Sequence, residues 1–331
     1  MYVTRASLIR VAKETVQKRV LSDPGLVAAY LTGSVRTDNP FLGNATDIDI
    51  VFVHAGETKI QREILPLTPE IHLDIVHNPR SLYDKPKELR VHPWLGPELY
   101  DPLPLYVTRH FFEFIQAGVR DRYNDPASVQ ARSHRLAEDA RQVWANLHPA
   151  QPHGPDQVLD YLRAISLAAN AVALLSGELL SERRFLIQFP ERTGAAGQAG
   201  LAADLLNLLG AGQVDAAALA GFLPEWEKTF LEAAGSSTVE KSISSARLGY
   251  YKLAFETMLS STTPHALLWP LLLTWTLSVS VLPAEWHARW RSACVVLGLD
   301  QSSFDERLGE LDHFLDSIEA LQEKLALSQG L

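Results

Sequence analysis

The segment 47–53, with the sequence DIDIVFV, constrains the fold more than any other stretch of this chain. Its β-branched and apolar residues at 48–53 are typical of a central strand. Successive side chains point to opposite faces of a strand, so Asp47 and Asp49 share one face while Ile48 and Ile50 enter the layer behind. The segment therefore predicts a buried strand that presents two carboxylates on one face.

A second apolar run, at 71–76, carries a third carboxylate, Asp74. If this run pairs alongside the first strand with the same face forward, Asp74 joins Asp47 and Asp49. Three carboxylates so close repel one another strongly unless a counter-charge lies among them. Their hard oxygen ligands suit Mg²⁺, and two such ions can hold the attacking and leaving oxygens of a displacement at phosphorus. His72 shares the Asp74 face and either lines this site or is a polar edge residue.

A turn with anion-binding chemistry precedes these strands. The apolar run at 26–31 predicts a strand that ends near Gly33 and Ser34. A glycine lets the backbone approach a phosphate closely, and N–H groups at a helix start favour an anion. The segment 38–44 is dense in turn formers and predicts a loop that leads to the Asp47 strand.

This order of features resembles a known family. A Gly-Ser turn, then Thr-Asp-Ile-Asp after an intervening loop at 35–46, then a third Asp on a following strand, resembles the nucleotidyltransferases of the DNA polymerase beta superfamily. Kanamycin and streptomycin nucleotidyltransferases and the minimal nucleotidyltransferases share the pattern. The resemblance covers about residues 7–78. An Asp-Ile-Asp pattern alone would usually mean a solvated strand edge, but its spacing from the Gly-Ser pair and from Asp74 makes coincidence a poor explanation.

The resemblance implies roles for six residues. It implies that Asp47, Asp49 and Asp74 are the catalytic carboxylates and the ligands of two Mg²⁺ ions, with Asp74 on the catalytic ion. It also implies that Gly33, Ser34 and the adjacent amides bind the β- and γ-phosphates of ATP or another nucleoside triphosphate. Arg36 resembles the basic residue that often follows the Gly-Ser pair, although its offset differs by about one position.

The fold class that follows is α+β. We expect a nucleotidyltransferase fold (a small mixed sheet with helices) over residues 1–105, then an all-α helical substrate-binding domain over 106–331. A length of 331 residues suits two domains, and the proline-rich region 80–104 is the expected connection. In the first domain, a first helix precedes residue 22, and 57–65 has helical character. Beyond it, periodicity predicts helices at about 105–118, 126–147, 156–177, 237–260, 264–281, 283–298 and 303–327, with a glycine-rich loop at 193–200.

The composition limits which classes of partner and which cellular location we expect for this chain. The net charge is −9, so the chain lacks the basic footprint of a protein that binds duplex nucleic acid, and a nucleic-acid partner is not expected. The single cysteine, Cys294, lies in an apolar stretch and is expected in the core rather than as a nucleophile. The longest apolar run, 266–277, is broken by Pro270 and too short to span a bilayer. We therefore expect a cytoplasmic protein without a membrane partner.

The expected reaction is transfer of a nucleoside monophosphate from the triphosphate to an acceptor hydroxyl, and AMP is the nucleoside monophosphate that we expect. The acceptor is a small molecule or a protein. Residues beyond 105 carry a net charge of −8, which suits a cationic acceptor such as an aminoglycoside, although solvated helix surfaces explain the same balance. Two alternatives stay open: a minimal nucleotidyltransferase that adenylylates a protein, and a catalytically retired nucleotide-binding regulatory module.

Several residues of the helical half are weaker candidates. Asp139, Asp160 and Glu178 are the carboxylates expected in an acceptor wall. Arg141 and His148 loosely resemble the ribonuclease motif of toxins that accompany minimal nucleotidyltransferases, but two helical surface residues explain them better. The basic residues that could reach phosphates, or form a solvated face, are Lys241, Arg247 and Lys252.

Overall fold

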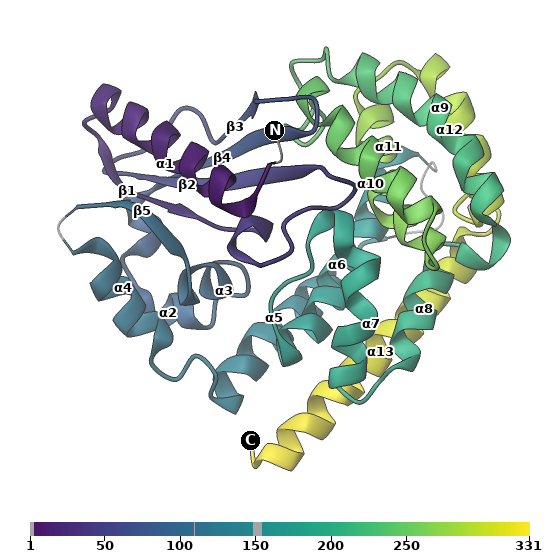
Figure 1. The fold of residues 1–331 in the computed structure, drawn as a ribbon. Coiled ribbons are helices and arrows are strands. Elements are labelled where there is room, and N and C mark those ends of the chain that lie inside the picture. The colour runs from purple at the N-terminus through teal and green to yellow at the C-terminus, as the bar shows by residue number, and fades with distance from the viewer. Residues whose placement is uncertain (1–2, 109, 148–153) are drawn as a thin grey trace. The chain divides into compact units, whose positions relative to one another are not determined.

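The computed structural model describes residues 3–108, 110–147 and 154–331, and it is an α+β protein (Figure 1). Contacts divide the chain into two compact units. The first is Met1–Asn124 together with Ala246–Ala254, and the second is Asp125–Ser245 together with Phe255–Leu331. The division expected after residue 105 thus lies at Asn124, and a short segment from late in the sequence returns to the first unit.

The first unit is built on a five-stranded mixed sheet with the order β3-β4-β2-β1-β5. β2 and β4 are parallel neighbours, and the other pairs are antiparallel. Both central parallel strands are buried along most of their length, as expected for their β-branched sequences. The strands are β1 (Leu26–Leu31), β2 (Thr46–His54), β3 (Arg62–Pro66), β4 (Ile71–Pro79) and β5 (Leu103–Val107).

Helices cover both faces of this sheet. The helices of the first unit are α1 (Arg5–Ser22), α2 (Pro86–Arg90), α3 (Leu95–Tyr100) and α4 (Phe111–Arg120), with 3₁₀ turns η1 (Ser34–Arg36) and η2 (Arg80–Tyr83). Thr4 and Ser7 form a reciprocal capping box at the start of α1. α1 packs on one face, and α2, α3 and α4 pack on the other (Figure 1).

The alternation expected for β2 is present. Ile48, Ile50 and Phe52 pack in the core beneath α1. Val51 and Val53 face the opposite core, under α2 to α4. Because side chains alternate along a strand, the residues at odd positions nearer the start of β2 share this second face. That face is therefore apolar toward the end of the strand and carries carboxylates toward its beginning.

Two sheet-edge segments differ from the expectation. The helical character expected for 57–65 is wrong, because Arg62–Pro66 is the edge strand β3, paired with β4. The connection expected at 80–104, and the helix expected from 105, are interrupted by β5, which pairs with β1. β5 contains Pro104, which an edge strand tolerates because one side of it has no ladder partner.

The second unit is helical. Its principal helices are α5 (Pro126–Ala145), α6 (Pro155–Ser176), α7 (Phe185–Ala195), α8 (Gly200–Leu208), α9 (Ala216–Ala233), α11 (Leu268–Ser280), α12 (His287–Leu297) and α13 (Phe304–Gln329), and α10 (Leu248–Leu259) is divided between the units at Ala254. The helix expected at 237–260 begins only at Leu248, since turns occupy the residues before it. The loop expected at 193–200 is shorter, because α7 continues to Ala195 and α8 starts at Gly200.

The structure explains the roles of two further residues singled out from the sequence, Arg141 and Cys294. Arg141 on α5 donates to Asp316 (2.7 Å) and Glu319 (2.8 Å) and to Asp312 on α13, so it joins two helices. His148 lies outside the described residues. Cys294 is buried on α12, and burial raises the pKa of its thiol, which keeps it from acting as a nucleophile.

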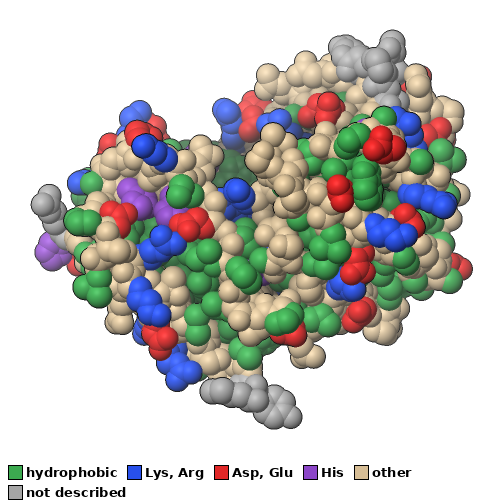
Figure 2. All heavy atoms as spheres, turned by 90° about the horizontal axis from the view of Figure 1, so that it is seen from above, with side chains coloured by type: hydrophobic (Ala, Val, Ile, Leu, Met, Phe, Trp, Pro, Cys, Tyr) green, Lys and Arg blue, Asp and Glu red, His purple; other side chains and the backbone are tan. Residues whose placement is uncertain are grey.

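On the face drawn in Figure 2, acidic and basic side chains are interspersed. Among the described residues one helix, α6, is long and apolar enough to cross a membrane, and 72% of its most apolar window is buried within the protein. Length and apolar composition alone do not distinguish a membrane-spanning helix from a buried core helix.

Candidate functional site

The register of the two parallel strands assembles a polar cluster at their N-terminal ends. Asp47 of β2 lies opposite His72 of β4, and Asp49 lies opposite Asp74. All four share the face on which Val51 and its neighbours form the second core, as the alternation requires. Ligand atoms of Asp47, His72 and Asp74 all lie within 4.8 Å of one another, and these three side chains are buried.

Asp49 completes the cluster and is held against the turn after β1. A Cβ atom on Gly33 would lie 1.8 Å from Asp49 Oδ2, and Gly33 has a φ of +66°. Burial, and then the charges of Asp47 and Asp74, raise the pKa of the Asp49 carboxyl well above its usual range, against the lowering effect of two arginines. The cluster therefore carries the like-charge repulsion that a bound cation would relieve.

The loop between the turn and β2 is fixed by polar contacts. Gly43 and Asn44 both have positive φ, which gives the tight turn that closes the Leu42–Ala45 bridge. Ser34 Oγ donates to the carbonyl of Pro40 at 3.2 Å and lies 3.3 Å from Thr46 Oγ1. The Ser34 hydroxyl thus ties the loop to the start of β2, next to the carboxylates.

Two arginines, Arg36 and Arg5, make polar contacts at the turn that follows β1. Arg36 Nη2 lies 3.9 Å from Asp101 Oδ2, beyond the end of α3. Arg5, on α1, donates to the backbone carbonyls of Val35 and Arg36, both at 2.8 Å. These bonds fix the backbone of η1 from the α1 side, a contribution that the sequence pattern did not indicate.

Arg62 on β3 binds Asp74 through both of its oxygens. Its Nε donates to Oδ1 at 2.7 Å and its Nη2 to Oδ2 at 2.5 Å. Asp74 is 3% exposed, while the Arg62 side chain is 37% exposed. A bidentate pair of this kind is strong and geometrically specific. The segment that contains Arg62 was expected to be helical, so its place beside Asp74 was not foreseen.

The returning segment 246–254 covers the Asp47 side of the cluster. Tyr250 donates its hydroxyl to Asp47 Oδ2 at 2.7 Å, and its ring packs edge-on against His72. Arg247 is buried, lies 4.0 Å from Asp47 Oδ2 and is stacked over the Tyr250 ring. Gly249 lets this segment lie close to the backbone of Pro69, because a Cβ at Gly249 would be only 2.1 Å from the Pro69 carbonyl oxygen.

These residues fit a divalent cation. Asp47 and Asp74 supply carboxylate oxygens and His72 an imidazole from one small volume, and the neighbouring Asp49 carboxyl has its pKa raised by burial and then by the charges of Asp47 and Asp74. Oxygen ligands suit Mg²⁺, and the added imidazole extends the range to metals such as Mn²⁺. His72 was considered only as a residue that could line the site, and the register places it among the potential ligands.

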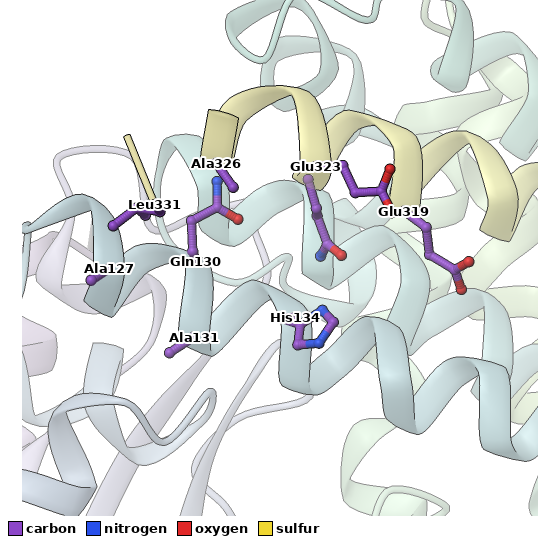
Figure 3. A pocket seen from close by; sticks show the side chains of 9 residues that line it. Ala127, Gln130, Ala131, His134, Glu319, Glu323, Ala326 and Leu331 are labelled. Carbon is purple, nitrogen blue, oxygen red and sulfur yellow. The ribbon is translucent and has the colours of Figure 1, made fainter. Parts of the chain in front are cut away.

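The second unit carries a separate pocket of about 530 Å³ between α5 and α13 (Figure 3). Its lining residues are Ala127, Gln130, Ala131, His134, Glu319, Gln322, Glu323, Ala326 and Leu331. Glu319 is already engaged by Arg141. Of the carboxylates expected in an acceptor wall, Asp139 pairs with Arg135 on α5, and Asp160 and Glu178 are exposed. None of these three lines this pocket.

Comparisons with known proteins give little support. No protein-family model matches the sequence, and no curated protein matches it. Among solved structures, a crystal structure of a nucleotidyltransferase-like protein from Exiguobacterium sibiricum covers 76% of this chain and 76% of its own, with 11% identity and a TM-score of 0.27. Such a low TM-score supports no assignment, so the functional hypothesis depends on the residues themselves.

Proposed function

We propose that this chain is a metal-dependent nucleotidyltransferase that moves a nucleoside monophosphate from a nucleoside triphosphate to an acceptor hydroxyl. One observation carries the proposal: Asp47 and Asp49 on β2 lie in register with His72 and Asp74 on the parallel strand β4, beside the positive-φ turn at Gly33. That arrangement combines a cation site with backbone suited to a phosphate.

Asp47, Asp49 and Asp74 are the residues that would hold Mg²⁺, with His72 beside them. The bound metal would supply positive charge to the phosphate oxygens and to the departing pyrophosphate. The backbone N–H groups at Gly33 and Ser34 would contact the β- and γ-phosphates, since N–H groups at the start of a helical turn favour an anion. Arg36 and the buried Arg247 would add positive charge near the triphosphate.

In the reaction, the acceptor oxygen forms a bond to the α-phosphorus. The bond from that phosphorus to the oxygen that bridges to the β-phosphate breaks, and pyrophosphate leaves with the electron pair. Asp74 would take the proton of the acceptor hydroxyl. Each of its oxygens already accepts one hydrogen bond from Arg62, so Asp74 would take the proton on a remaining lone pair.

The donor and the acceptor are the finer parts of the proposal. ATP is the proposed donor, so the transferred group is AMP. A small-molecule acceptor such as an aminoglycoside would suit the net charge of −8 beyond residue 105, and a protein side chain is the alternative acceptor. Asp139, Asp160 and Glu178 remain the candidates for an acceptor-facing carboxylate.

The test is release of pyrophosphate from each of the four nucleoside triphosphates with Mg²⁺ or Mn²⁺, in the presence of aminoglycosides or of protein acceptors. We expect metal-dependent release with ATP that Asp47→Asn abolishes. Asp84→Asn, an exposed position in the same unit, is the matched control and should retain it. Release that is equal in both variants would show that the cluster is not the catalytic site.

One observation favours a second candidate, a retired nucleotide-binding module. Asp74 is held by Arg62, and Asp47 accepts a hydrogen bond from Tyr250, so two of the three carboxylates already have strong protein partners. In that case ATP would bind, as measured by calorimetry, and no pyrophosphate would be released with any acceptor. Binding together with release would exclude this candidate.

A further inference from the structure

A histidine pair joins the opposite ends of the same two strands. His54 is the last residue of β2, and His77 lies near the end of β4. His54 Nε2 and His77 Nδ1 are 2.9 Å apart. The pair lies on the α1 side of the sheet, where His77 is opposite Phe52, and so on the other face from Asp47 and Asp49.

The outer nitrogen of each ring meets a carboxylate. His54 Nδ1 is 3.3 Å from Asp23 Oδ2, at the C-terminal end of α1. His77 Nε2 is 2.7 Å from Glu63 Oε1 on β3. The other oxygen of Glu63 accepts a hydrogen bond from Arg19 of α1 at 2.7 Å. The charged groups around the two rings therefore come from the C-terminal end of α1 and from β3.

The number of N–H groups limits how this chain of contacts can be satisfied. Each neutral imidazole has one N–H donor and one acceptor nitrogen. Carboxylates accept hydrogen bonds, so Asp23 and Glu63 each favour an N–H on the ring nitrogen that faces them. The two inner nitrogens would then point lone pairs at each other across 2.9 Å. Both carboxylates can face an N–H donor only if a cation, either a third proton or a metal ion, lies between the inner nitrogens; otherwise one ring turns a lone pair toward its carboxylate.

The surroundings of the two rings favour a metal ion. The His54 and His77 side chains are largely buried, 15% and 8% exposed, and each has a carboxylate at its outer nitrogen. Imidazole nitrogens are suitable ligands of Zn²⁺, and a zinc-bound histidine commonly donates its other N–H to a carboxylate. Both features are present in the contacts of His54 and His77.

We propose that His54 Nε2 and His77 Nδ1 form a binding site for a divalent transition metal of the Zn²⁺ type, with water completing the coordination. Zn–N bonds of about 2.0–2.1 Å at a tetrahedral angle need inner nitrogens about 3.3 Å apart, so the rings have to separate by only roughly 0.4 Å. Asp23 and Glu63 orient the rings, and Arg19 holds Glu63 in place. The site is independent of the proposed transfer reaction.

The experiment is titration of the full chain with Zn²⁺ in excess Mg²⁺, followed by calorimetry, and with Co²⁺ followed by visible absorption. Excess Mg²⁺ is present to reduce Zn²⁺ binding at the carboxylate cluster, and His72→Gln identifies any Zn²⁺ that still binds there. We expect one site in the wild type, lost in His54→Gln and in His77→Gln. It should persist in His72→Gln and in the exposed control His134→Gln. Asp23→Asn, which retains both ligands, should weaken binding by about 10–100-fold.

Folding of each variant is checked by far-UV circular dichroism, and histidine side-chain nitrogen NMR of the wild type provides a readout without substitution. Zn²⁺ should shift the inner-nitrogen signals of His54 and His77 in the wild type. If these signals do not move, or if both glutamine variants bind Zn²⁺ as the wild type does, the proposal is overturned. An inner proton that persists at neutral pH in the presence of Zn²⁺ would also overturn it.

Discussion

Gly33 and Asp49 occupy each other's space: a Cβ atom on the glycine would lie 1.8 Å from Oδ2 of the aspartate. Gly33 also has φ +66° and ψ −161°, a conformation that is essentially restricted to glycine. Two independent physical reasons thus require glycine here. The turn after β1 and the carboxylate on β2 form one structural unit, and this is why the spacing of the sequence motif carries information.

Gly33→Ala is expected to lower the free energy of unfolding by about 1–3 kcal/mol, because alanine is strained in this conformation. It should also displace the Asp49 carboxylate and weaken Mg²⁺ binding. Urea denaturation and metal titration measure the two effects. Gly56→Ala is the control, since its Cβ would meet nothing within 4 Å. Equal stability of the two variants would contradict the close approach of Gly33 to the Asp49 carboxylate.

Asp49→Asn is expected to stabilise the metal-free protein and to abolish pyrophosphate release. Removing the charge avoids the desolvation of a buried carboxylate and relieves its repulsion by Asp47 and Asp74, the causes that raise the pKa of this carboxyl. Thermal unfolding in a chelator gives the measurement, with Asp84→Asn as the control. A clear loss of stability would instead assign Asp49 a structural role.

Arg62→Gln tests the competition between an internal cation and a metal. The free energy of unfolding should fall by about 1–3 kcal/mol, since Asp74 loses a bidentate partner. The decrease should lie near the lower limit of this range, because the arginine is partly exposed. Added Mg²⁺ should then raise the unfolding midpoint more than it does in the wild type. Arg10→Gln, on the exposed part of α1, controls for loss of charge. An unchanged response to Mg²⁺ would mean that Arg62 and metal do not compete.

Tyr250→Phe removes the hydroxyl that donates to Asp47 and keeps the ring that packs on His72. The expected cost is about 1 kcal/mol of unfolding free energy, since the buried carboxylate loses one hydrogen bond. Mg²⁺ affinity should rise, because an oxygen of Asp47 becomes available. Calorimetric titration measures this, with Tyr106→Phe on β5 as the control. Weaker Mg²⁺ binding would show that Tyr250 supports the site rather than competing for it.

The central strands and the shared face of Asp47 and Asp49 could be predicted from the sequence because they depend on local alternation, whereas the place of Asp74 also depends on the pairing of β4 with β2. β1, β2 and β4 are strongly apolar runs, and the face shared by Asp47 and Asp49 follows from strand periodicity. The edge strand β3 has no fully buried residue, so its pattern is weak and its conformation depends on pairing with β4. The proline in β5 suggested a linker instead of an edge strand.

The partners of the carboxylates could not be predicted for a different reason. Arg62 reaches Asp74 across a strand pair that was not foreseen. Tyr250 is separated by 203 positions from Asp47, the residue to which it donates. The hydrophobic periodicity of a short stretch of sequence cannot predict this contact, because the contact depends on the path by which the chain returns to the first unit. Arg247 was considered as a phosphate contact or a solvated residue, and the structure shows it buried near Asp47.

Glu98 on α3 gives a prediction for the dependence of stability on pH. It accepts a hydrogen bond from Tyr30, whose hydroxyl lies 3.0 Å from that of Tyr83. Burial raises the pKa of the Glu98 carboxyl, against the hydrogen bond from Tyr30 and the charge of Arg36. A carboxyl with a raised folded-state pKa contributes stability below its unfolded pKa of about 4.3 and loses that contribution as the pH rises through the folded value.

Glu98→Gln should therefore become more stable relative to the wild type as the pH increases from about 4.5 to 7. The glutamine stays neutral, and its carbonyl can still accept the Tyr30 hydroxyl, so the variant has no charge to desolvate. Urea denaturation across this pH range gives the difference in unfolding free energy at each pH. Glu14→Gln on the exposed face of α1 is the control for the loss of a carboxyl. If the curve for Glu98→Gln runs parallel to that of the wild type, Glu98 does not ionise in this range and its burial does not limit stability.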